Sequence, residues 1–297
     1  MTDLGIERPQ YAALTTPDPE RAARFATDVM GFTVAHVDSA GRHYLRGHGA
    51  DAFSLVYGPG DHGIDHLGYL VATWETLDRA HAALDEQGVE ARLDESPDIW
   101  AGAPALSFRT PAGFELRLTT GTDVRAPMAA TTPEPERVPG PICCDHIVPR
   151  TPHMEQEMAF AERVLGLRLS AQIVAPGAGA VIAFYRGGLL FHCLAVARSS
   201  STGLHHVQFT VKSPLHLYAA VDRIREAGGE IIWGPVRHGP GHNIAVYFRD
   251  GAGNFVEYSC EEEVIFDDAS YQPRVWSAAD QKSMDEWGSQ PPSVFFT

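Results

Sequence analysis

The feature that most constrains the fold of this 297-residue chain is an internal repeat. Three pairs of segments carry it: 11–17 with 146–152 at an offset of 135, then 64–69 with 204–209 and 108–113 with 248–253 at an offset of 140. The change of offset indicates small insertions in loops, where extra residues are tolerated. We therefore predict a duplicated unit of roughly 120–140 residues, about one domain each by the usual length prior.

Each unit has the pattern of a strand, a helix and several further strands. The spacing of apolar residues, with Pro, Asp or Gly at the ends, predicts helices over 17–29, 74–87 and 215–227. Alternating apolar residues before Gly-containing turns predict strands over 105–108 and 244–248. The mixture of both periods predicts an α+β fold.

The repeat also predicts the domain organisation. Residues 1–121 form the first domain and residues 141–263 the second. Between them, residues 122–140 contain four prolines and no apolar period, as a linker does. Residues 264–297 form a C-terminal extension with two tryptophans, which we expect to pack on the body or on a neighbouring subunit and to help close the site.

Composition limits the class of protein. The chain is 44% hydrophobic, but no apolar run approaches the ~20 residues that a membrane span needs. A net charge of −15 argues against nucleic acid as a partner, because phosphate binding needs a basic face. The N-terminus has no secretory pattern, and the four cysteines lack disulfide-like spacing. We expect a cytoplasmic protein without a membrane partner.

Three residues of the second unit lie in apolar runs that read as strands: His146, His206 and Glu257. Taken singly, each histidine is more readily explained as a buried structural residue. Taken together with the repeat, two imidazoles and one carboxylate predict a facial metal triad with open positions. A carboxylate in mid-strand supports this reading, because burying it unpaired is costly.

His205 stands beside His206, so the choice between them depends on strand geometry. Adjacent side chains of a strand point to opposite faces, and only one can face a cavity. The repeat aligns His206 with His66, so we assign His206 to the metal and expect His205 to be a packed or surface residue. The acidic run 261–263 is predicted to be a solvated face.

The most specific motif lies at the end of the second unit. Residues 236–238 are Val-Arg-His, seven residues follow, and residues 246–257 are Val-Tyr-Phe-Arg-Asp-Gly-Ala-Gly-Asn-Phe-Val-Glu. This pattern resembles the signature of type I extradiol ring-cleavage dioxygenases, the catechol 2,3-dioxygenase-like branch of the vicinal oxygen chelate superfamily. Gly251 stands where that family usually has proline. This difference changes the rigidity of a turn but does not alter a metal ligand.

The resemblance implies a glyoxalase-like fold of tandem βαβββ modules, two in each of two homologous domains. It implies a degenerate metal site in the first domain, and the sequence agrees: Tyr11 and Arg117 occupy the positions of His146 and Glu257, and only His66 remains as a relic. It also implies a homo-oligomer, a tetramer or a dimer.

The resemblance further implies Fe(II) as the cofactor, with Mn(II) possible, and a catechol-type substrate together with O2. His192 matches the acid–base histidine on the oxygen side, and His238 and Tyr247 match residues that contact the catechol. Each has a competing interpretation: His192 as a core histidine, His238 as a turn residue and Tyr247 as an aromatic residue of a strand.

The function expected from these features is Fe(II)-dependent extradiol cleavage, in which both atoms of O2 enter the ring and a muconic semialdehyde-type product forms. A glyoxalase-like isomerase would share the fold but usually draws its ligands from both modules. A non-catalytic aromatic- or drug-binding module of the same superfamily would lack the triad, and no motif supports a cupin or a metalloprotease. The sequence does not identify the substituents of the catechol, because it places none of the arginines at 150, 186, 198, 237 and 274.

Overall fold

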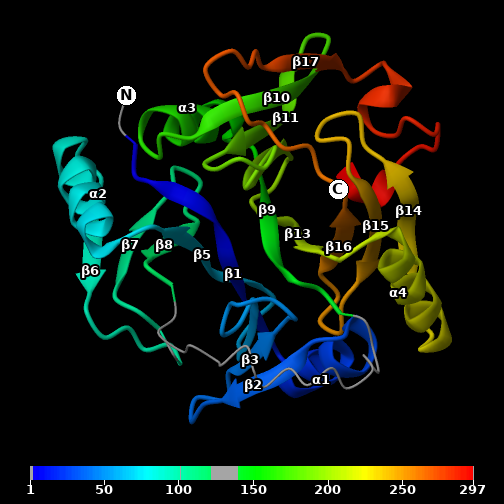
Figure 1. Ribbon diagram of the computed structural model, residues 1–297, viewed down its shortest axis with the longest axis horizontal. Coiled ribbons are helices and arrows are strands. Elements are labelled where there is room, and N and C mark those ends of the chain that lie inside the picture. Colours follow the sequence, from blue (N-terminus) through cyan, green and yellow to red (C-terminus); the bar gives the residue numbers. More distant parts are fainter. Residues whose placement is uncertain (1–2, 101, 122–139, 297) are drawn as a thin grey trace.

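The repeat is visible in the architecture of the computed structural model, which describes residues 3–100, 102–121 and 140–296 (Figure 1). The first half comprises β1 (Ile6–Thr16), α1 (Pro19–Phe25), the π-helical turn η1 (Ala26–Met30), β2 (Thr33–Val37), β3 (His43–Arg46) and β4 (Leu55–Pro59), then β5 (Gly63–Val71), α2 (Trp74–Glu86), β6 (Ala91–Asp94), β7 (Ala105–Arg109) and β8 (Glu115–Thr119). Each group is one βαβββ module.

The second half repeats the path. It comprises β9 (Cys143–Thr151), α3 (Met154–Arg163), β10 (Arg168–Ala175), β11 (Gly179–Arg186) and β12 (Leu194–Arg198), then β13 (Gly203–Thr210), α4 (Pro214–Glu226), β14 (Ile231–Arg237), β15 (Ile244–Arg249) and β16 (Phe255–Cys260). The extension adds β17 (Arg274–Ser277), η3 (Gln281–Ser283) and η4 (Ser293–Phe296). The predicted α+β fold of tandem βαβββ modules is confirmed. The predicted linker lies, apart from Gly140, outside the described residues.

Local chemistry explains where the helices begin and end. The Asp18 carboxylate accepts a hydrogen bond from the Arg21 amide at 2.9 Å and so caps the start of α1. The helical stretch ends at Gly31, whose φ of 84° is a left-handed conformation that suits glycine. In the same way α4 ends shortly before Gly228, at φ 76°.

Each half forms one mixed sheet, in the orders β2-β3-β4-β1-β5-β8-β7-β6 and β14-β15-β16-β13-β9-β12-β11-β10-β17. The first strands of the two modules pair antiparallel at the centre of each sheet: β1 with β5, and β9 with β13. In the second sheet β16 runs parallel beside β13. The strands β16, β13 and β9 are therefore neighbours, which matters for the site.

The two halves share one hydrophobic core rather than merely touching. Buried side chains of both halves belong to a single cluster, and β1 packs against β9. Buried hydrogen bonds cross the boundary: the Tyr57 hydroxyl donates to the Asp250 carboxylate at 2.6 Å, and the Tyr258 hydroxyl donates to the Met30 carbonyl at 2.6 Å. In Figure 1 the C-terminal segment ends beside β15 and β16, within the second half.

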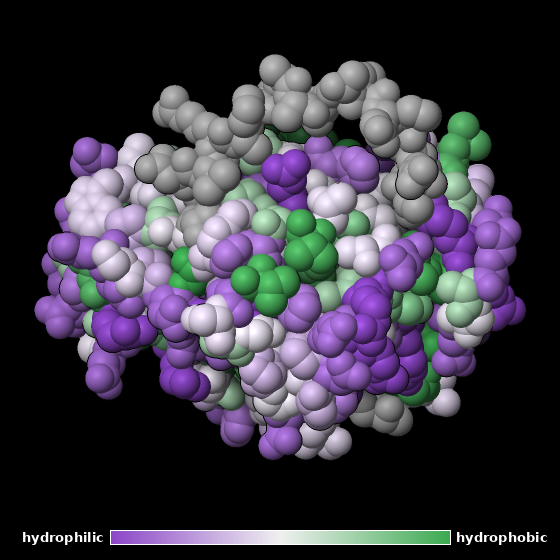
Figure 2. Space-filling view, turned by 90° about the horizontal axis from the view of Figure 1, so that it is seen from below, coloured by the Kyte–Doolittle hydropathy of each residue, from purple (hydrophilic) through white to green (hydrophobic). Residues whose placement is uncertain are grey.

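Polar side chains predominate on the face shown in Figure 2, where apolar side chains stand in small separate groups. This agrees with the excess of acidic over basic residues. None of the described helices is long and apolar enough to cross a membrane.

Candidate active site

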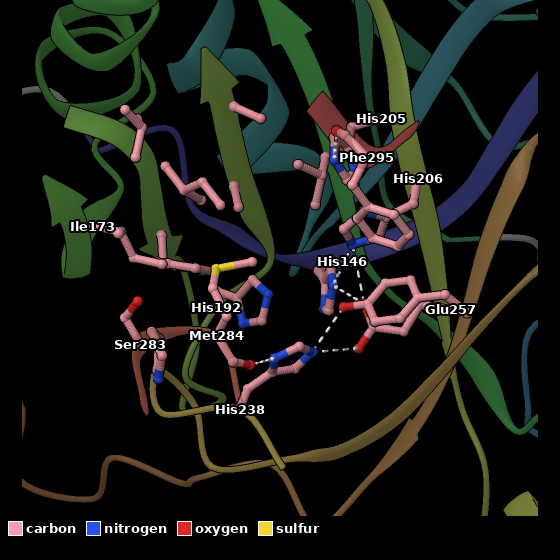
Figure 3. Close-up of a pocket in the computed structure, with 18 of the residues that line it drawn as sticks. His146, Ile173, His192, His205, His206, His238, Glu257, Ser283, Met284 and Phe295 are labelled. Atoms are coloured by element: carbon pink, nitrogen blue, oxygen red, sulfur yellow. Dashed lines mark hydrogen bonds and ion pairs between the residues drawn. The ribbon is translucent and has the colours of Figure 1, made fainter. Parts of the chain in front are cut away.

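Three adjacent strands bring the predicted metal ligands together (Figure 3). His146 lies on β9, His206 on β13 and Glu257 on β16. The Nε2 atom of His206 lies 3.0 Å from Glu257 Oε2, and His146 Nε2 lies 3.4 Å from the same oxygen. The two Nε2 atoms are 3.3 Å apart, and all three side chains are buried.

These distances suit a metal. Bonds of about 2.1 Å at right angles place neighbouring ligand atoms about 3 Å apart, as observed here. These three residues would hold a metal and, as only three ligands, would leave coordination positions for other groups. The described residues contain two clusters of this kind: this triad, and a group formed by His146, His192 and Glu262.

The protonation states favour ligation. Burial lowers the pKa of His146 to about 4, so its imidazole is neutral at neutral pH. Burial by itself would raise the pKa of Glu257, but the contacts from His146 and His206 outweigh it and hold that pKa well below its ordinary value. A neutral imidazole and a carboxylate are the forms that bind metal. The Asn243 side chain also donates to Glu257 Oε1 at 3.1 Å.

The triad faces a cavity of about 340 Å³. Its polar lining includes His192, His238, Asn243 and Tyr247. Its apolar lining comes from the strands β9 to β12, from Trp233, and from the extension, which adds Ala278, Met284 and Phe295. Each predicted catalytic residue therefore lies in the same cavity as the predicted metal ligands.

His192 lies between β11 and β12, with its ring centre 3.8 Å from that of His146. Its Nδ1 lies 2.7 Å from Glu262 Oε1, and its backbone amide donates to the same oxygen at 3.1 Å. The prediction of a solvated acidic run is therefore wrong for Glu262, whose side chain is only 7% exposed. The chain turns at Glu261, which has a φ of 62°, and carries the next side chain inward.

Glu262 lies in an acidic microenvironment. Burial raises its pKa to about 7. Burial, and next the neighbouring Glu262 carboxylate, raise the pKa of Asp145 well above the ordinary value. Burial lowers the pKa of His192 to about 4, so its ring is neutral and Nδ1–H donates to Glu262. The His192 Nε2 atom is then left with its lone pair.

His238 follows β14 and contacts Tyr247 on β15. Its Nδ1 lies 2.7 Å from the Met284 carbonyl, and its Nε2 lies 2.8 Å from the Tyr247 hydroxyl. Because a carbonyl only accepts, Nδ1 carries a proton, and in this tautomer Nε2 accepts from the Tyr247 hydroxyl. Burial, and next Glu257, raise the pKa of Tyr247 well above its ordinary value, so its hydroxyl keeps its proton.

His205 is packed, as predicted, but the strand alternation that set it apart from His206 fails. The pairing of β13 with β9 shifts register between Leu204 and His206, and both rings line the cavity. The Nδ1 atoms of His205 and His206 are 2.7 Å apart, and His205 Nε2 lies 2.9 Å from the Phe295 carbonyl. A β-bulge of this kind redirects side chains that a regular strand would separate.

The equivalent positions of the first half contain no such ligand set among the described residues. Tyr11 fills the place of a histidine, and its hydroxyl lies 3.0 Å from His66 Nε2. Arg117 stands opposite Glu257 in the repeat and bonds to Glu115 at 3.0 Å. The first half therefore has a packed aromatic contact where the second has a cavity.

Sequence reasoning missed four contributors to the site: Asn243, Glu262, Met284 and Phe295. Two of them act through backbone carbonyls, which every residue has, so the sequence held no signal for them. Asn243 lies within the spacer of the motif, and Glu262 stands in a run of three glutamates.

The family is established by comparison with known proteins. The model of the Glyoxalase/Bleomycin resistance protein/Dioxygenase superfamily matches residues 8–118 and 144–258. The chain belongs to this superfamily, and the two matches correspond to the two halves of the repeat. The resemblance drawn from the sequence is thereby confirmed at the level of the family.

One curated relative is similar to part of the chain. The chain is 32% identical to metapyrocatechase 2 of Cupriavidus necator over 157 residues, which is 50% of this chain and 45% of the relative. That alignment thus spans less than half the length of the relative.

Solved structures show the same fold. The 2,3-dioxygenase LapB of Pseudomonas sp. KL28 matches with a TM-score of 0.82 and 24% identity, over 92% of this chain and 98% of that one. Homoprotocatechuate 2,3-dioxygenase of Arthrobacter globiformis matches with a TM-score of 0.88 and 21% identity, over 100% and 92%. The enzyme of the same name from Brevibacterium fuscum, in complex with 3,4-dihydroxyphenylacetate, gives 0.86 and 23%, over 98% and 91%.

Proposed function

We propose that this protein is an Fe(II)-dependent extradiol dioxygenase that inserts both atoms of O2 into a catechol-type aromatic, with meta cleavage to a muconic semialdehyde-type product. The observation that carries the proposal is the buried triad of His146, His206 and Glu257 facing one cavity with His192, His238 and Tyr247. The names of the relatives support it, since they include a metapyrocatechase, 2,3-dioxygenases and an extradiol ring-cleaving dioxygenase.

The triad would hold Fe(II), with Mn(II) as the alternative. Fe(II) in such a site supplies open positions for both catechol oxygens and O2 and conducts electrons between them. The protein's own part is to orient the ligands: Asn243 donates to Glu257, and burial keeps the His146 imidazole neutral. The cavity walls hold the aromatic ring against these groups.

Two pairs of residues in the cavity would carry out proton transfer. The Tyr247 hydroxyl and His238 Nε2 form one pair, which contacts a catechol hydroxyl and accepts its proton. The other pair is Glu262 and His192, whose Nε2 lone pair would accept the second catechol proton and return it later in the reaction.

One experiment separates this function from its rivals. The protein is purified without oxygen, its iron is counted, and oxygen uptake is followed with a panel of catechols. Stoichiometric iron, oxygen consumption and a yellow ring-fission chromophore support the proposal. Turnover of methylglyoxal and thiol without O2 would select the isomerase, and tight aromatic binding without turnover would select the binding module.

We further propose the domain division 1–121 and 141–263, joined by 122–140 and followed by 264–297, in a cytoplasmic homotetramer or homodimer. Exposed apolar side chains of the extension support an assembly: Val275 on β17 is 63% exposed and Phe266 is 83% exposed. Light scattering on the full chain tests this, and a monomer at micromolar concentration would contradict it.

A further inference from the structure

One side of the cavity, here called the apolar wall, is lined by Val148, Ile173, Ile182, Phe184, Ala195 and Ala197. Ala195 and Ala197 are buried on β12, and their small side chains leave the space that the cavity occupies. This wall has no hydrogen-bonding side chain.

Arginines that could bind a substrate carboxylate form ion pairs with acidic residues of the protein instead. Arg186 and Arg274 pair with Asp268 and Glu263 outside the cavity. Arg237 pairs with Glu261 at 2.8 Å.

Arg198 is the one arginine among the described lining residues. Its Nε donates to the Ala180 carbonyl at 2.9 Å, and its Nη2 pairs with Glu155. Arg150 lines two other cavities and not this one. The described part of the chain thus presents no pair of arginines that could clamp a carboxylate.

We infer that the preferred substrate is a catechol with an uncharged, apolar substituent that lies against the apolar wall. This inference rests on the proposed ring-cleavage function and specifies its substrate. A carboxylate facing the wall would lose its hydration without gaining a partner, which is costly. An alkyl group gains instead, by about fourfold in affinity for each methylene removed from water.

The test compares catechol, 4-methyl-, 4-ethyl- and 4-propylcatechol with 3,4-dihydroxyphenylacetate, by oxygen uptake and by anaerobic binding. We expect kcat/KM to rise along the alkyl series, and the carboxylated compound to fall at least about tenfold below 4-ethylcatechol. Equal or better use of the carboxylated compound would overturn the inference.

Two variants locate the effect. Ala197→Leu fills the space at the wall and should lower kcat/KM for 4-propylcatechol at least about tenfold, with a smaller change for catechol. Arg198→Gln tests the lining arginine directly: a selective loss of the carboxylated compound in this variant would identify Arg198 as a clamp and overturn the inference. Anaerobic binding in the expected order without oxygen uptake would refute the proposed reaction but not the substituent preference.

A second observation concerns the C-terminal extension, which contributes two backbone carbonyls to the site (Figure 3). The Phe295 carbonyl accepts from His205 Nε2 at 2.9 Å, so the His205 proton lies on that atom. His205 Nδ1 then accepts from His206 Nδ1–H at 2.7 Å. The lone pair of His206 is thereby left on Nε2, which faces Glu257 at 3.0 Å.

The Met284 carbonyl acts in the same way on His238. It accepts from Nδ1–H at 2.7 Å, and this leaves Nε2 to accept from the Tyr247 hydroxyl at 2.8 Å. The loop that holds Met284 is fixed by the buried Asp285, whose carboxylate accepts from the amides of Arg237, Trp287 and Ser289.

We propose that the extension sets the tautomers of the site through two independent arms. The first arm runs from Phe295 through His205, a positioning residue, to the metal ligand His206. The second runs from Met284 to the His238–Tyr247 pair. Partners of this kind typically change metal affinity by about 10- to 100-fold.

The first arm is tested by metal release. Removal of residues 293–297, or His205→Leu, should speed the dissociation of Zn²⁺ or Fe²⁺ at least about tenfold. His205→Gln can accept and donate, so it should restore most of the affinity. Nitrogen NMR of the zinc-loaded enzyme should show the His206 proton on Nδ1. Unchanged metal release in both disrupting variants would overturn this arm.

The control is His66→Leu, which removes a buried imidazole from the equivalent strand of the first half. It should lower the melting temperature without changing metal release. If His205→Leu does not fold, the deletion and His205→Gln still decide the matter.

The second arm is tested with Asp285→Ala, which frees the Met284 loop. We expect kcat to fall at least about tenfold with unchanged metal release, because His238 is not a ligand. Asp267→Ala is the matched control, since that exposed carboxylate of the extension bonds to Ser270. Faster metal release in Asp285→Ala with normal kcat would contradict the separation into two arms.

Discussion

Two buried glutamates five residues apart show how the surroundings of a residue decide its chemistry. At Glu257, contacts with two imidazoles outweigh the effect of burial and keep the pKa low, so the side chain is a carboxylate. At Glu262, burial dominates and the pKa rises to about 7, so the group exchanges its proton near neutral pH. The first suits a metal ligand, and the second suits a partner for His192, the proposed acid–base residue.

Replacing His146, His206 or Glu257 with Ala should abolish metal binding without unfolding the chain. Each supplies one of three ligands, while the shared core lies in other side chains. Metal content and thermal melting of each purified variant check this. A fully metal-loaded Glu257→Ala protein would remove Glu257 from the site.

His192→Phe should keep metal and substrate affinity but lower kcat by about 100-fold or more, because its proton is needed only during turnover. Glu262→Gln should lower kcat less, since the amide oxygen still accepts from His192 Nδ1. Steady-state kinetics with anaerobic binding separate the two effects. Normal turnover of the Phe variant would show His192 to be a packing residue.

In the metal-free protein, His146 and His192 should each contribute a loss of stability as the pH falls from about 6.5 to 4. Glu262 and Asp145, whose pKa values are raised, act in the opposite direction. His146 and His192 have pKa values near 4 when folded and about 6.5 when unfolded, so the unfolded chain binds more protons in this range. Urea unfolding at several pH values measures the slope. His192→Phe should flatten it, and an unchanged slope would contradict the neutral buried imidazole.

At the scale of the strand, the two halves differ in the size of the side chains at equivalent positions of the paired central strands. Tyr11 on β1 stands opposite Gly68 on β5, whereas the smaller His146 on β9 stands opposite Gln208 on β13. A Cβ at Gly68 would come within 2.2 Å of the Tyr11 ring. The Tyr11 ring therefore requires a glycine at position 68. In the first half this ring fills the space where the second half has the cavity beside His146.

Gly68→Ala should destabilise the protein by about 1–3 kcal/mol, because the buried Tyr11 ring packs on Phe53 and bonds to His66 and so resists displacement. Metal affinity should be unaffected. Gly63→Ala is the control on the same strand, since its Cβ would meet only Thr15 Oγ1 at an ordinary 3.5 Å. Equal stability of the two variants in urea would contradict the size constraint.

At the scale of the whole molecule, the halves are coupled by their common core and by buried hydrogen bonds. The metal-free chain should therefore unfold in one transition, with circular dichroism and tryptophan fluorescence coinciding. Tyr57→Phe removes a donor from buried Asp250 and should lower the unfolding free energy by about 1–3 kcal/mol. Tyr218→Phe, on an exposed ring of α4, is the control, and two separate transitions would refute the coupling.

The sequence by itself determined the repeat and the order of strands and helices, and it picked out the three residues that the structure brings together as a candidate ligand set. Caps and glycines act locally, so the bounds of α1 and α4 follow from nearby residues. His146, His206 and Glu257 could be found because a metal needs particular residue types and the repeat aligned their strands.

Only the tertiary structure decided which other groups reach the site. His192 meets Glu262 across 70 residues, and His205 meets the Phe295 carbonyl across 90. The first contact depends on a turn that reverses the exposure of one glutamate, and the second depends on a bulge and on a backbone atom that every residue carries. Such contacts arise from how distant strands pack, and no local pattern of residues records them.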